Sequence, residues 1–213
     1  RGLSEDALDF ATPLLGGDTS STSGPVTISI TAIGTVETFV ARRGARVGDG
    51  VYVSGPIGEA ALGLWLRENP GRLETLPLEA RDGLLGRYLL PRPRLDLIPM
   101  LASAATASMD ISDGLVGDLA KIMGVYGVSA VVTLSDIPLS LAALQAIALS
   151  PELLEIALTG GDDYEILFTA GGDFSPPEGI RRIGWVTAGS NPPKLCDGEG
   201  KSVIFKKDSY RHF

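Results

Sequence analysis

Hydrophobic and polar residues follow two rhythms along the chain, one typical of strands and one typical of helices. Over residues 26–36, β-branched residues alternate with polar ones, which predicts a strand. Over residues 4–15 the apolar positions recur with helical spacing, so that Leu8, Ala11 and Leu15 share one face and predict a helix. The first part of the chain is therefore expected to contain one helix, a Gly/Ser/Thr-rich loop and one strand.

The remaining chain predicts strands and helices in alternation, which indicates the α/β class. Strands are expected at 51–55, up to Asp110, at 128–134, in the apolar run before residue 170 and at 181–188, with a hairpin over 196–205. Helices are expected at 57–69, 78–90, 95–105, 113–126, 140–148 and 151–158. The segment PRPR at 91–94 separates two of these helices because proline cannot continue a helix.

A domain boundary is expected near residue 36. One helix and one strand cannot bury their own apolar faces, so residues 1–36 read as the end of a domain rather than as a domain. Residues 37–213 are long enough for one α/β domain. The chain begins at Arg1 without an initiator methionine, which suggests that upstream sequence exists.

Composition narrows the classes of partner. The 213 residues are 44% hydrophobic and 21% charged, which predicts a globular core, and the formal net charge is −8. An acidic surface argues against nucleic acid or an anionic membrane as partner, but carboxylates can hold a phosphorylated small molecule through Mg²⁺. No apolar run reaches the roughly 20 residues needed to span a bilayer. The single cysteine, Cys196, excludes an intrachain disulfide and fits a reducing, cytoplasmic compartment.

Three short motifs combine carboxylates with glycines where regular elements meet. They are LLGGDTS at 14–20, MDISDGL at 109–115 and TGGDDYE at 159–165. Glycine allows the backbone to approach a ligand closely, and carboxylate oxygens bind hard cations. Each motif also has a purely structural interpretation, as an Asx turn, a helix cap or a polar turn before a strand.

The second motif has the clearest chemistry. If residues 107–112 are extended, Asp110 and Ser112 lie on one face, and Asp113 then stands at the start of a helix. One Mg²⁺ ion could take oxygens from both aspartates while the Ser112 hydroxyl contacts a phosphate. In the structural alternative, Asp113 caps the helix and Asp110 is merely solvated.

Other catalytic chemistries fit the sequence poorly. The single histidine, His212, would have to serve any Ser–His–Asp triad, and one histidine with one cysteine cannot make a Cys/His zinc site. Neither G-x-x-x-x-G-K-[ST] nor G-x-G-x-x-G after a strand occurs. A phosphate site in this chain must therefore work through metal ions and arginine.

Taken in order, the motifs resemble the thiamine-monophosphate kinase family, within the aminoimidazole ribonucleotide synthetase-related superfamily. The matching segments are LLGGDTS, R-x-G-A-x-x-G-D at 42–49, DISDGL, GGDDYEILFT and the terminal Y-x-H-F at 210–213. The resemblance extends from about Leu14 to Phe213, the C-terminal two-thirds of the family's length. It implies a mixed sheet flanked by helices, with residues 37–213 as the C-terminal domain and residues 1–36 as the last helix and strand of an N-terminal ATP-binding domain.

The resemblance implies Mg²⁺-dependent transfer of the γ-phosphate of ATP to thiamine monophosphate, which gives thiamine diphosphate without a catalytic side chain. The positions that match ATP-contacting residues are Gly17, Asp18, Arg42 and Ser112. The positions that match metal ligands are Asp18, Asp110 and Asp113, and those that match substrate contacts are Asp162, where many relatives carry Glu, and Tyr210. The full-length family is implied to be homodimeric through its N-terminal domain.

One departure from the family pattern leaves two alternatives open. The family's N-terminal domain supplies further glycine- and aspartate-rich segments, and none of them precedes residue 14. The chain is therefore expected to be an inactive or weakly active fragment, and its alternative role is that of a non-catalytic module binding phosphate ligands. The other alternative is a different ATP-using enzyme of the same superfamily, against which the GGDDYE motif and the Y-x-H-F ending weigh.

Overall fold

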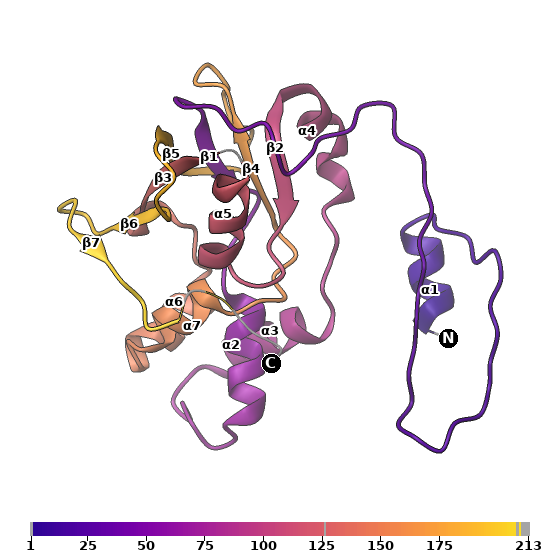
Figure 1. The fold of residues 1–213 in the computed structure, drawn as a ribbon. Helices are drawn as coiled ribbons and strands as arrows, with labels where there is room; N and C mark the ends of the chain where they lie inside the picture. The colour runs from indigo at the N-terminus through magenta and orange to yellow at the C-terminus, as the bar shows by residue number, and fades with distance from the viewer. Residues whose placement is uncertain (1, 126, 208, 210–213) are drawn as a thin grey trace. The chain divides into compact units, whose positions relative to one another are not determined.

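The structure is a computed structural model that describes residues 2–125, 127–207 and 209. Its contacts divide the chain into two compact units, Arg1–Glu37 and Thr38–Phe213. The larger unit holds every strand among the described residues (Figure 1).

The N-terminal unit contains a shorter helix than the sequence predicts. Helix α1 spans Gly2–Asp9, whereas the prediction ran to residue 15. The chain leaves the helix at Ala11, whose φ of 52° is left-handed. Pro13 explains the early end, because proline has no backbone N–H and disfavours helical geometry in the residue before it.

The predicted strand at 26–36 is wrong for this structure. The segment has no strand assignment, and Val26, Ile28 and Ile30 are 90%, 70% and 71% exposed. Strand structure requires hydrogen bonds to a neighbouring strand, and the described residues supply none to this segment. The alternating pattern therefore favours a strand, but the strand forms only when a neighbouring strand pairs with it.

The larger unit is built on a seven-stranded mixed sheet in the order β2-β4-β1-β5-β3-β6-β7. The strands are β1 (Gly50–Val53), β2 (Ala105–Asp110), β3 (Val128–Thr133), β4 (Ile166–Ala170), β5 (Arg181–Ala188), β6 (Lys194–Cys196) and β7 (Ser202–Val203). All neighbouring pairs are antiparallel except β3 and β6, which are parallel. The pairing brings the ends of β1 and β2 and the starts of β4 and β5 to one end of the sheet.

The two faces of the sheet bury different clusters. Successive side chains of a strand point to opposite faces, so Val51 and Val53 of β1 join one core while Tyr52 joins the other. Helix α5 (Leu115–Gly124) packs on the first face through apolar residues at helical spacing, among them Leu115 and Leu119. On the second face, Tyr52 stacks on Phe168 with ring centroids 5.2 Å apart, beside α4 (Ile98–Ala104).

Four helices gather at the end of the sheet where β1 and β2 finish (Figure 1). They are α2 (Glu59–Glu68), α3 (Leu78–Leu89), α6 (Leu141–Leu149) and α7 (Leu153–Thr159), and they share a core of their own. Apart from residues 26–36, every predicted strand and helix has a counterpart within a few residues, and PRPR does separate α3 from the short 3₁₀ helix Leu95–Leu97. The mixed sheet with flanking helices confirms the expected fold class.

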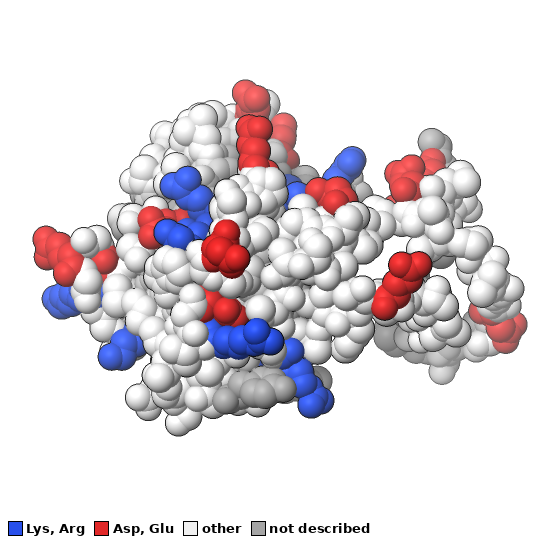
Figure 2. Space-filling model, turned by 90° about the horizontal axis from the view of Figure 1, so that it is seen from above, with Lys and Arg blue, Asp and Glu red and all other residues white. Residues whose placement is uncertain are grey.

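The surface mixes both signs of charge. On the face shown in Figure 2, Lys and Arg side chains lie among Asp and Glu side chains rather than in a continuous stripe. None of the helices in the described ranges has the length and apolar character needed to cross a membrane.

Candidate functional site

Two of the three acidic motifs are joined backbone to backbone at the end of the sheet. We call Asp110–Gly114 the aspartate loop and Gly160–Glu165 the acidic turn. The Tyr164 N–H donates to the Ile111 carbonyl at 2.9 Å, and the Ile111 N–H donates to the Glu165 carbonyl at 2.8 Å. The Asp162 N–H donates to the Ser112 carbonyl at 3.0 Å. The β2–β4 pairing thus continues into both motifs and fixes their relative positions.

Glycine makes this close approach possible. A Cβ atom on Gly161 would lie 2.0 Å from the Ser112 carbonyl oxygen, so no side chain fits there. At Gly114, whose φ is 106°, a Cβ would lie 2.6 Å from the Thr159 carbonyl oxygen, which is also too close. The glycines of the motifs therefore bring the two loops into contact.

Replacing Gly161 with Ala is expected to destabilise the protein by about 1–3 kcal/mol, because the new methyl group meets backbone that must shift. The matched control is Gly83→Ala on the exposed face of α3, where a Cβ meets nothing within 4 Å. That control should stabilise the helix by up to about 1 kcal/mol. Chemical denaturation measures both changes, and equal effects would contradict the packing described for Gly161.

Side chains of the acidic turn divide between the surface and the interior. Asp163 and Glu165 are 2% and 4% exposed, whereas Asp162 and Tyr164 are half-buried. The Tyr164 hydroxyl donates to Asp162 Oδ1 at 3.3 Å. Asp162 and Tyr164 have φ values of 68° and 51°, a left-handed geometry that costs free energy in residues other than glycine and is common at functional sites.

Three half-buried aspartates, Asp110, Asp113 and Asp162, lie near enough to Tyr164 for their charges to act on it. Burial raises the pKa of the Tyr164 hydroxyl, and the negative charge and hydrogen bond of Asp162 act in the same direction. The charges of Asp110 and Asp113 raise this pKa further. The structure therefore brings predicted metal ligands and a predicted substrate contact from two separate motifs into one electrostatic neighbourhood.

Asp163 has a structural role. Its carboxylate accepts hydrogen bonds from the Gly58 N–H at 2.7 Å and the Ala60 N–H at 3.2 Å, at the N-terminus of α2. These N–H groups have no partner within the helix, and a carboxylate also complements the positive end of the helix dipole. The acidic turn is thereby attached to the helical cluster.

Asp163 should make stability depend on pH. Burial raises its pKa from 3.8 to about 7, against the opposing hydrogen bonds from Gly58 and Ala60. The unfolded chain then loses this proton at lower pH than the folded chain, so the free energy of unfolding should fall as pH rises from about 4 to about 7. In Asp163→Asn this contribution disappears, and denaturation curves across that range should show a flatter pH dependence than the wild type. Parallel profiles for the two proteins would contradict the assignment.

Glu165 is the centre of a buried ionic network. Its Oε2 accepts from the Ser54 hydroxyl at 2.5 Å and from Arg94 at 2.7 Å, and its Oε1 accepts from Arg87 at 2.9 Å. Arg94 also donates to the Ser54 carbonyl, and Arg87 pairs with Glu59. Four separate segments therefore meet at the start of β4, directly behind the acidic turn.

A second carboxylate, that of Asp118, shapes the aspartate loop. Asp118 is fully buried in α5, and its Oδ2 accepts from the backbone N–H groups of Ser112 and Asp113 at 3.0 Å each. The structural alternative that made Asp113 the helix cap is wrong: Gly114 holds that position, and Asp118 binds the two loop N–H groups that precede it. The Asp113 side chain therefore has no capping role.

Lys121 links Asp118 to Asp113. Its ammonium lies 2.7 Å from Asp118 Oδ1 and 2.5 Å from Asp113 Oδ2. Partial burial lowers the pKa of Lys121, but the hydrogen bonds to the two carboxylates outweigh it and raise the pKa overall. Lys121 is therefore a fixed positive charge beside the aspartate loop.

The donor set of the aspartate loop fits magnesium. Across residues 2–125, 127–207 and 209, no group of three or more acidic, histidine or cysteine side chains forms a complete metal cage. Mg²⁺ characteristically uses one or two carboxylates and takes its other ligands from water and substrate phosphates. Asp110 and Asp113, both half-buried at the end of β2, supply such a pair.

The remaining predicted site residues lie in three places. Arg42 is exposed, and the carbonyl of the preceding Ala41 accepts from Ser108 N of β2, so Arg42 lies along the same strand as Asp110. Gly17 and Asp18 lie on an exposed loop of the N-terminal unit. Tyr210 falls outside the described residues, as does the rest of the Y-x-H-F ending. The roles of these residues stay predictions.

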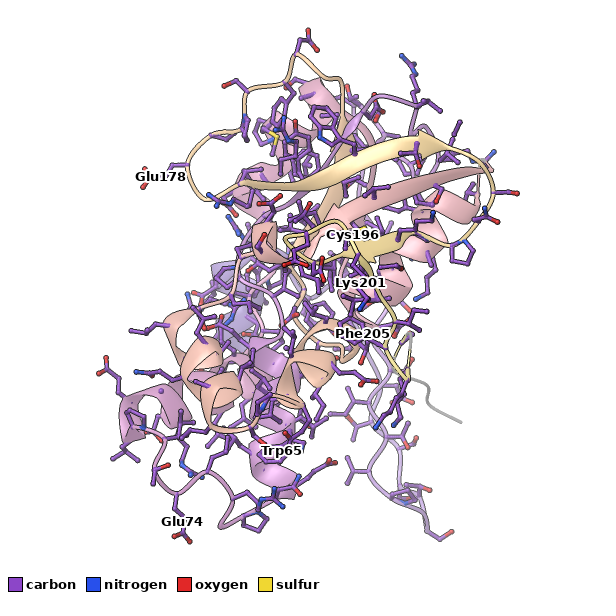
Figure 3. The ribbon with its side chains drawn as sticks, turned by 90° about the vertical axis from the view of Figure 1, so that its left-hand side faces the viewer. Trp65, Glu74, Glu178, Cys196, Lys201 and Phe205 are labelled. Carbon is purple, nitrogen blue, oxygen red and sulfur yellow. The ribbon has the colours of Figure 1, made fainter. Side chains whose placement is uncertain are left out.

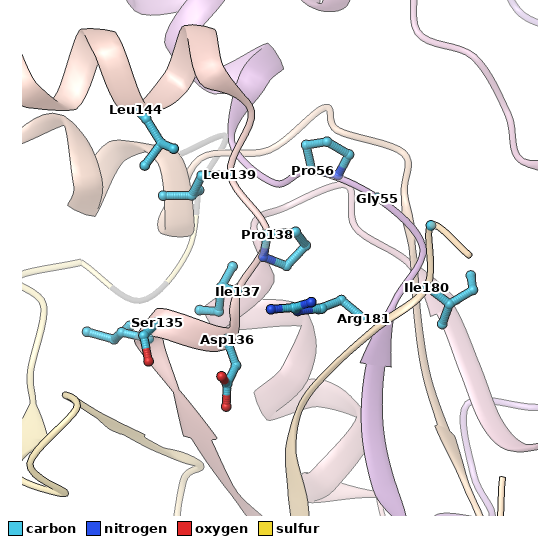
Figure 4. Close-up of a pocket in the computed structure, with 12 residues that line it drawn as sticks. Gly55, Pro56, Ser135, Asp136, Ile137, Pro138, Leu139, Leu144, Ile180 and Arg181 are labelled. Carbon is cyan, nitrogen blue, oxygen red and sulfur yellow. The ribbon is translucent and has the colours of Figure 1, made fainter. Parts of the chain in front are cut away.

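A cavity of about 630 Å³ lies at the same end of the sheet, between α6 and the start of β5. Its wall is mainly apolar, and Figure 4 shows Arg181 reaching from β5 toward the segment Ile137–Pro138. Asp136 is its one acidic lining residue, and the cavity includes no residue of the acidic motifs. None of the predicted metal ligands therefore lines this cavity.

Comparison with known families decides which fold this is. Residues 46–191 match the model of the AIR synthase related protein, C-terminal domain. The chain belongs to this family. That match includes both the aspartate loop and the acidic turn, so the family domain contains the candidate site.

Known relatives place this AIR synthase-related chain beside the thiamine-monophosphate kinases. It is 38% identical to the thiamine-monophosphate kinase of Caulobacter vibrioides over 97% of its own length and 58% of that protein. The crystal structure of thiamine monophosphate kinase from Aquifex aeolicus shares 35% identity and a TM-score of 0.64, over 78% of this chain and 55% of that one. The structure of AaThiL complexed with AMPPCP and TMP shares 34% identity and a TM-score of 0.68, over 83% and 55%.

These findings confirm the resemblance to thiamine-monophosphate kinases and show how much of their length it covers. The chain is a homologue of thiamine-monophosphate kinases, and it spans little more than half the length of the relatives just described.

Several important residues were not predicted from the sequence. Glu165 lies within a recognised motif but received no role, and its partners Arg87 and Arg94 lie 78 and 71 positions away. Asp118 and Lys121 did carry a local signal, since an acidic and a basic residue three positions apart on a helix can pair.

Proposed function

We propose that this chain carries the C-terminal part of a thiamine-monophosphate kinase, which transfers the γ-phosphate of ATP to thiamine monophosphate and yields thiamine diphosphate and ADP. The observation that carries the proposal is the joining of the aspartate loop to the acidic turn, with Asp110, Asp113 and Asp162 gathered around Tyr164. The likeness to thiamine-monophosphate kinases, including one complexed with AMPPCP and TMP, supports it.

Each residue has a role that its chemistry allows. Asp110 and Asp113 would hold Mg²⁺, which supplies neutralisation of phosphate charge, and Ser112 would contact ATP through its hydroxyl. Asp162 would face the substrate, whose thiazolium ring is cationic and is attracted by a carboxylate. In the same proposal Gly17, Asp18 and Arg42 contact ATP, Asp18 is a further metal ligand, and Tyr210 contacts the substrate.

The reaction needs no general base from the protein. The accepting group is the phosphate of thiamine monophosphate. The second pKa of a phosphate monoester, about 6, leaves this group mostly ionised at neutral pH. The obstacle is the approach of two anions, and catalysis of phosphoryl transfer rests on positioning and charge neutralisation. A chain with one histidine and many aspartates suits this chemistry. The single cysteine fits the cytoplasmic location that the sequence predicts.

A panel assay tests the proposal. The chain is incubated with ATP, Mg²⁺ and, in turn, thiamine monophosphate and the phosphate-acceptor substrates of other superfamily enzymes, and products are separated by chromatography. Thiamine diphosphate as the only new product supports the proposal. Phosphorylation of another acceptor in its place contradicts the proposal and favours a different member of the superfamily.

A second candidate function is ligand binding without turnover. The chain spans 58% of its Caulobacter relative, and the family's remaining part carries further predicted ATP contacts. Under this alternative the panel assay gives no product while calorimetry still detects Mg²⁺-dependent binding of thiamine diphosphate.

A further inference from the structure

The Lys121 ammonium has hydrogen-bonding capacity beyond its two contacts to carboxylates. Its ammonium bridges Asp118 Oδ1 and Asp113 Oδ2, and the side chain remains 41% exposed. An ammonium has three N–H donors, and in the described part of the chain two of them are used. The third donor is open to a ligand beside the aspartate loop.

The two carboxylates that pair with Lys121 differ in how readily they could give up that ion pair. Asp118 is fully buried and is fixed by two backbone N–H groups, so its charge needs a permanent cation. Asp113 has a side chain that is 34% exposed and is a proposed metal ligand. If Asp113 held a metal ion instead, Lys121 would stay beside Asp118 and would have a second N–H donor free for a ligand.

Charge balance at the site calls for such a cation. Asp110, Asp113 and Asp162 place negative charge near Tyr164, and the proposed reaction must admit phosphates beside the aspartate loop. Within the described ranges, Lys121 is the only cation ion-paired with the aspartate loop. Lysine binds phosphate as a compact point charge with several donors.

We infer that Lys121 is a phosphate-binding residue of this site, which exchanges its hydrogen bond to Asp113 for one to an oxygen of a metal-bound polyphosphate. The inference rests on the proposed function, which supplies the metal and the polyphosphate. It assigns Lys121 a ligand contact rather than the purely structural role of an ion pair on the surface of α5.

A structural role predicts a different result. If Lys121 only held Asp113 in place for the metal, removing its charge would weaken binding of the metal alone and of the metal with phosphate alike. If Lys121 binds phosphate, removing its charge leaves the binding of a lone divalent cation unchanged or strengthens it, because a competing positive charge is gone. Only the complex with phosphate then binds more weakly.

The experiment compares Lys121→Gln with Lys121→Arg and with Lys201→Gln in this chain. Lys201, labelled in Figure 3, is exposed between β6 and β7 and makes no side-chain ion pair with any residue that the structure describes, so it controls for the loss of one charge. Mn²⁺ alone is titrated by electron paramagnetic resonance, and magnesium pyrophosphate by calorimetry. Thermal unfolding checks that the variants are folded.

We expect Lys121→Gln to bind magnesium pyrophosphate about tenfold more weakly, the loss of one charge-assisted hydrogen bond, and to bind Mn²⁺ at least as well as wild type. Lys121→Arg and Lys201→Gln should keep most of the pyrophosphate affinity. Three results would overturn the inference. The first is that Lys121→Gln binds both Mn²⁺ and magnesium pyrophosphate more weakly to the same extent, and the second is that Lys121→Gln and Lys201→Gln bind pyrophosphate equally well. The third is that the wild type does not bind magnesium pyrophosphate at millimolar concentration. Pyrophosphate binding that depends on Lys121, together with phosphorylation of an acceptor other than thiamine monophosphate in the panel assay, would refute the proposed function alone.

Discussion

Asp113→Asn and Asp110→Asn are each expected to lower thiamine diphosphate formation at least about 100-fold, because each removes a carboxylate that holds the charge-neutralising metal. The fold should survive, since both side chains are half-buried at the end of β2 and neither belongs to a core cluster. Turnover is measured under the conditions of the panel assay in protein that shows activity there, and thermal unfolding is measured beside it.

The matched control for these two variants is Asp82→Asn. Asp82 is exposed on α3 and makes no side-chain hydrogen bond or ion pair within the described residues. The substitution Asp82→Asn removes the same charge where no ligand is proposed to bind, so turnover should stay at the wild-type level. Activity of the wild-type order in Asp110→Asn or Asp113→Asn would show that the metal assignment is wrong.

Replacing Glu165 with Ala should destabilise the protein by about 3–5 kcal/mol. The side chain is 5% exposed, and its removal leaves the partly buried guanidinium groups of Arg87 and Arg94 without their shared carboxylate. The Ser54 hydroxyl loses its acceptor as well. Chemical denaturation gives the free energy of unfolding.

Glu178→Ala is the control for Glu165. Figure 3 shows Glu178 on an outer loop, where it is exposed, so its removal should change stability by less than about 0.5 kcal/mol. A loss below about 1 kcal/mol for Glu165→Ala would mean that the network contributes no more than a surface ion pair does.

The sequence predicted the elements that carry their own pattern. The helix expected at 113–126 corresponds to α5, and the hairpin expected over 196–205 corresponds to β6 and β7. The strand predicted at 26–36 is absent. Alternating residues form a strand only when a neighbouring strand pairs with them, and a local sequence pattern does not show whether such a neighbour exists.

The candidate site was predictable in part. Its motifs identified Asp110, Asp113 and Asp162, whose convergence around Tyr164 follows from the β2–β4 pairing. The inward roles of Asp163 and Glu165 could not be predicted from the motif, because their partners come from α2, α3 and the proline-rich linker far along the chain. Local chemistry thus identifies candidate ligands, while the supporting contacts depend on the whole fold.

Calorimetric titration of this chain with thiamine diphosphate, in the presence of Mg²⁺ and again after its removal with a chelator, tests the central claim most directly. The account predicts binding that requires Mg²⁺ and that is lost in Asp113→Asn but kept in Asp82→Asn. Binding that is unchanged without Mg²⁺, or that persists in Asp113→Asn, would contradict a metal–phosphate site at the aspartate loop. So would the absence of any binding with Mg²⁺ present.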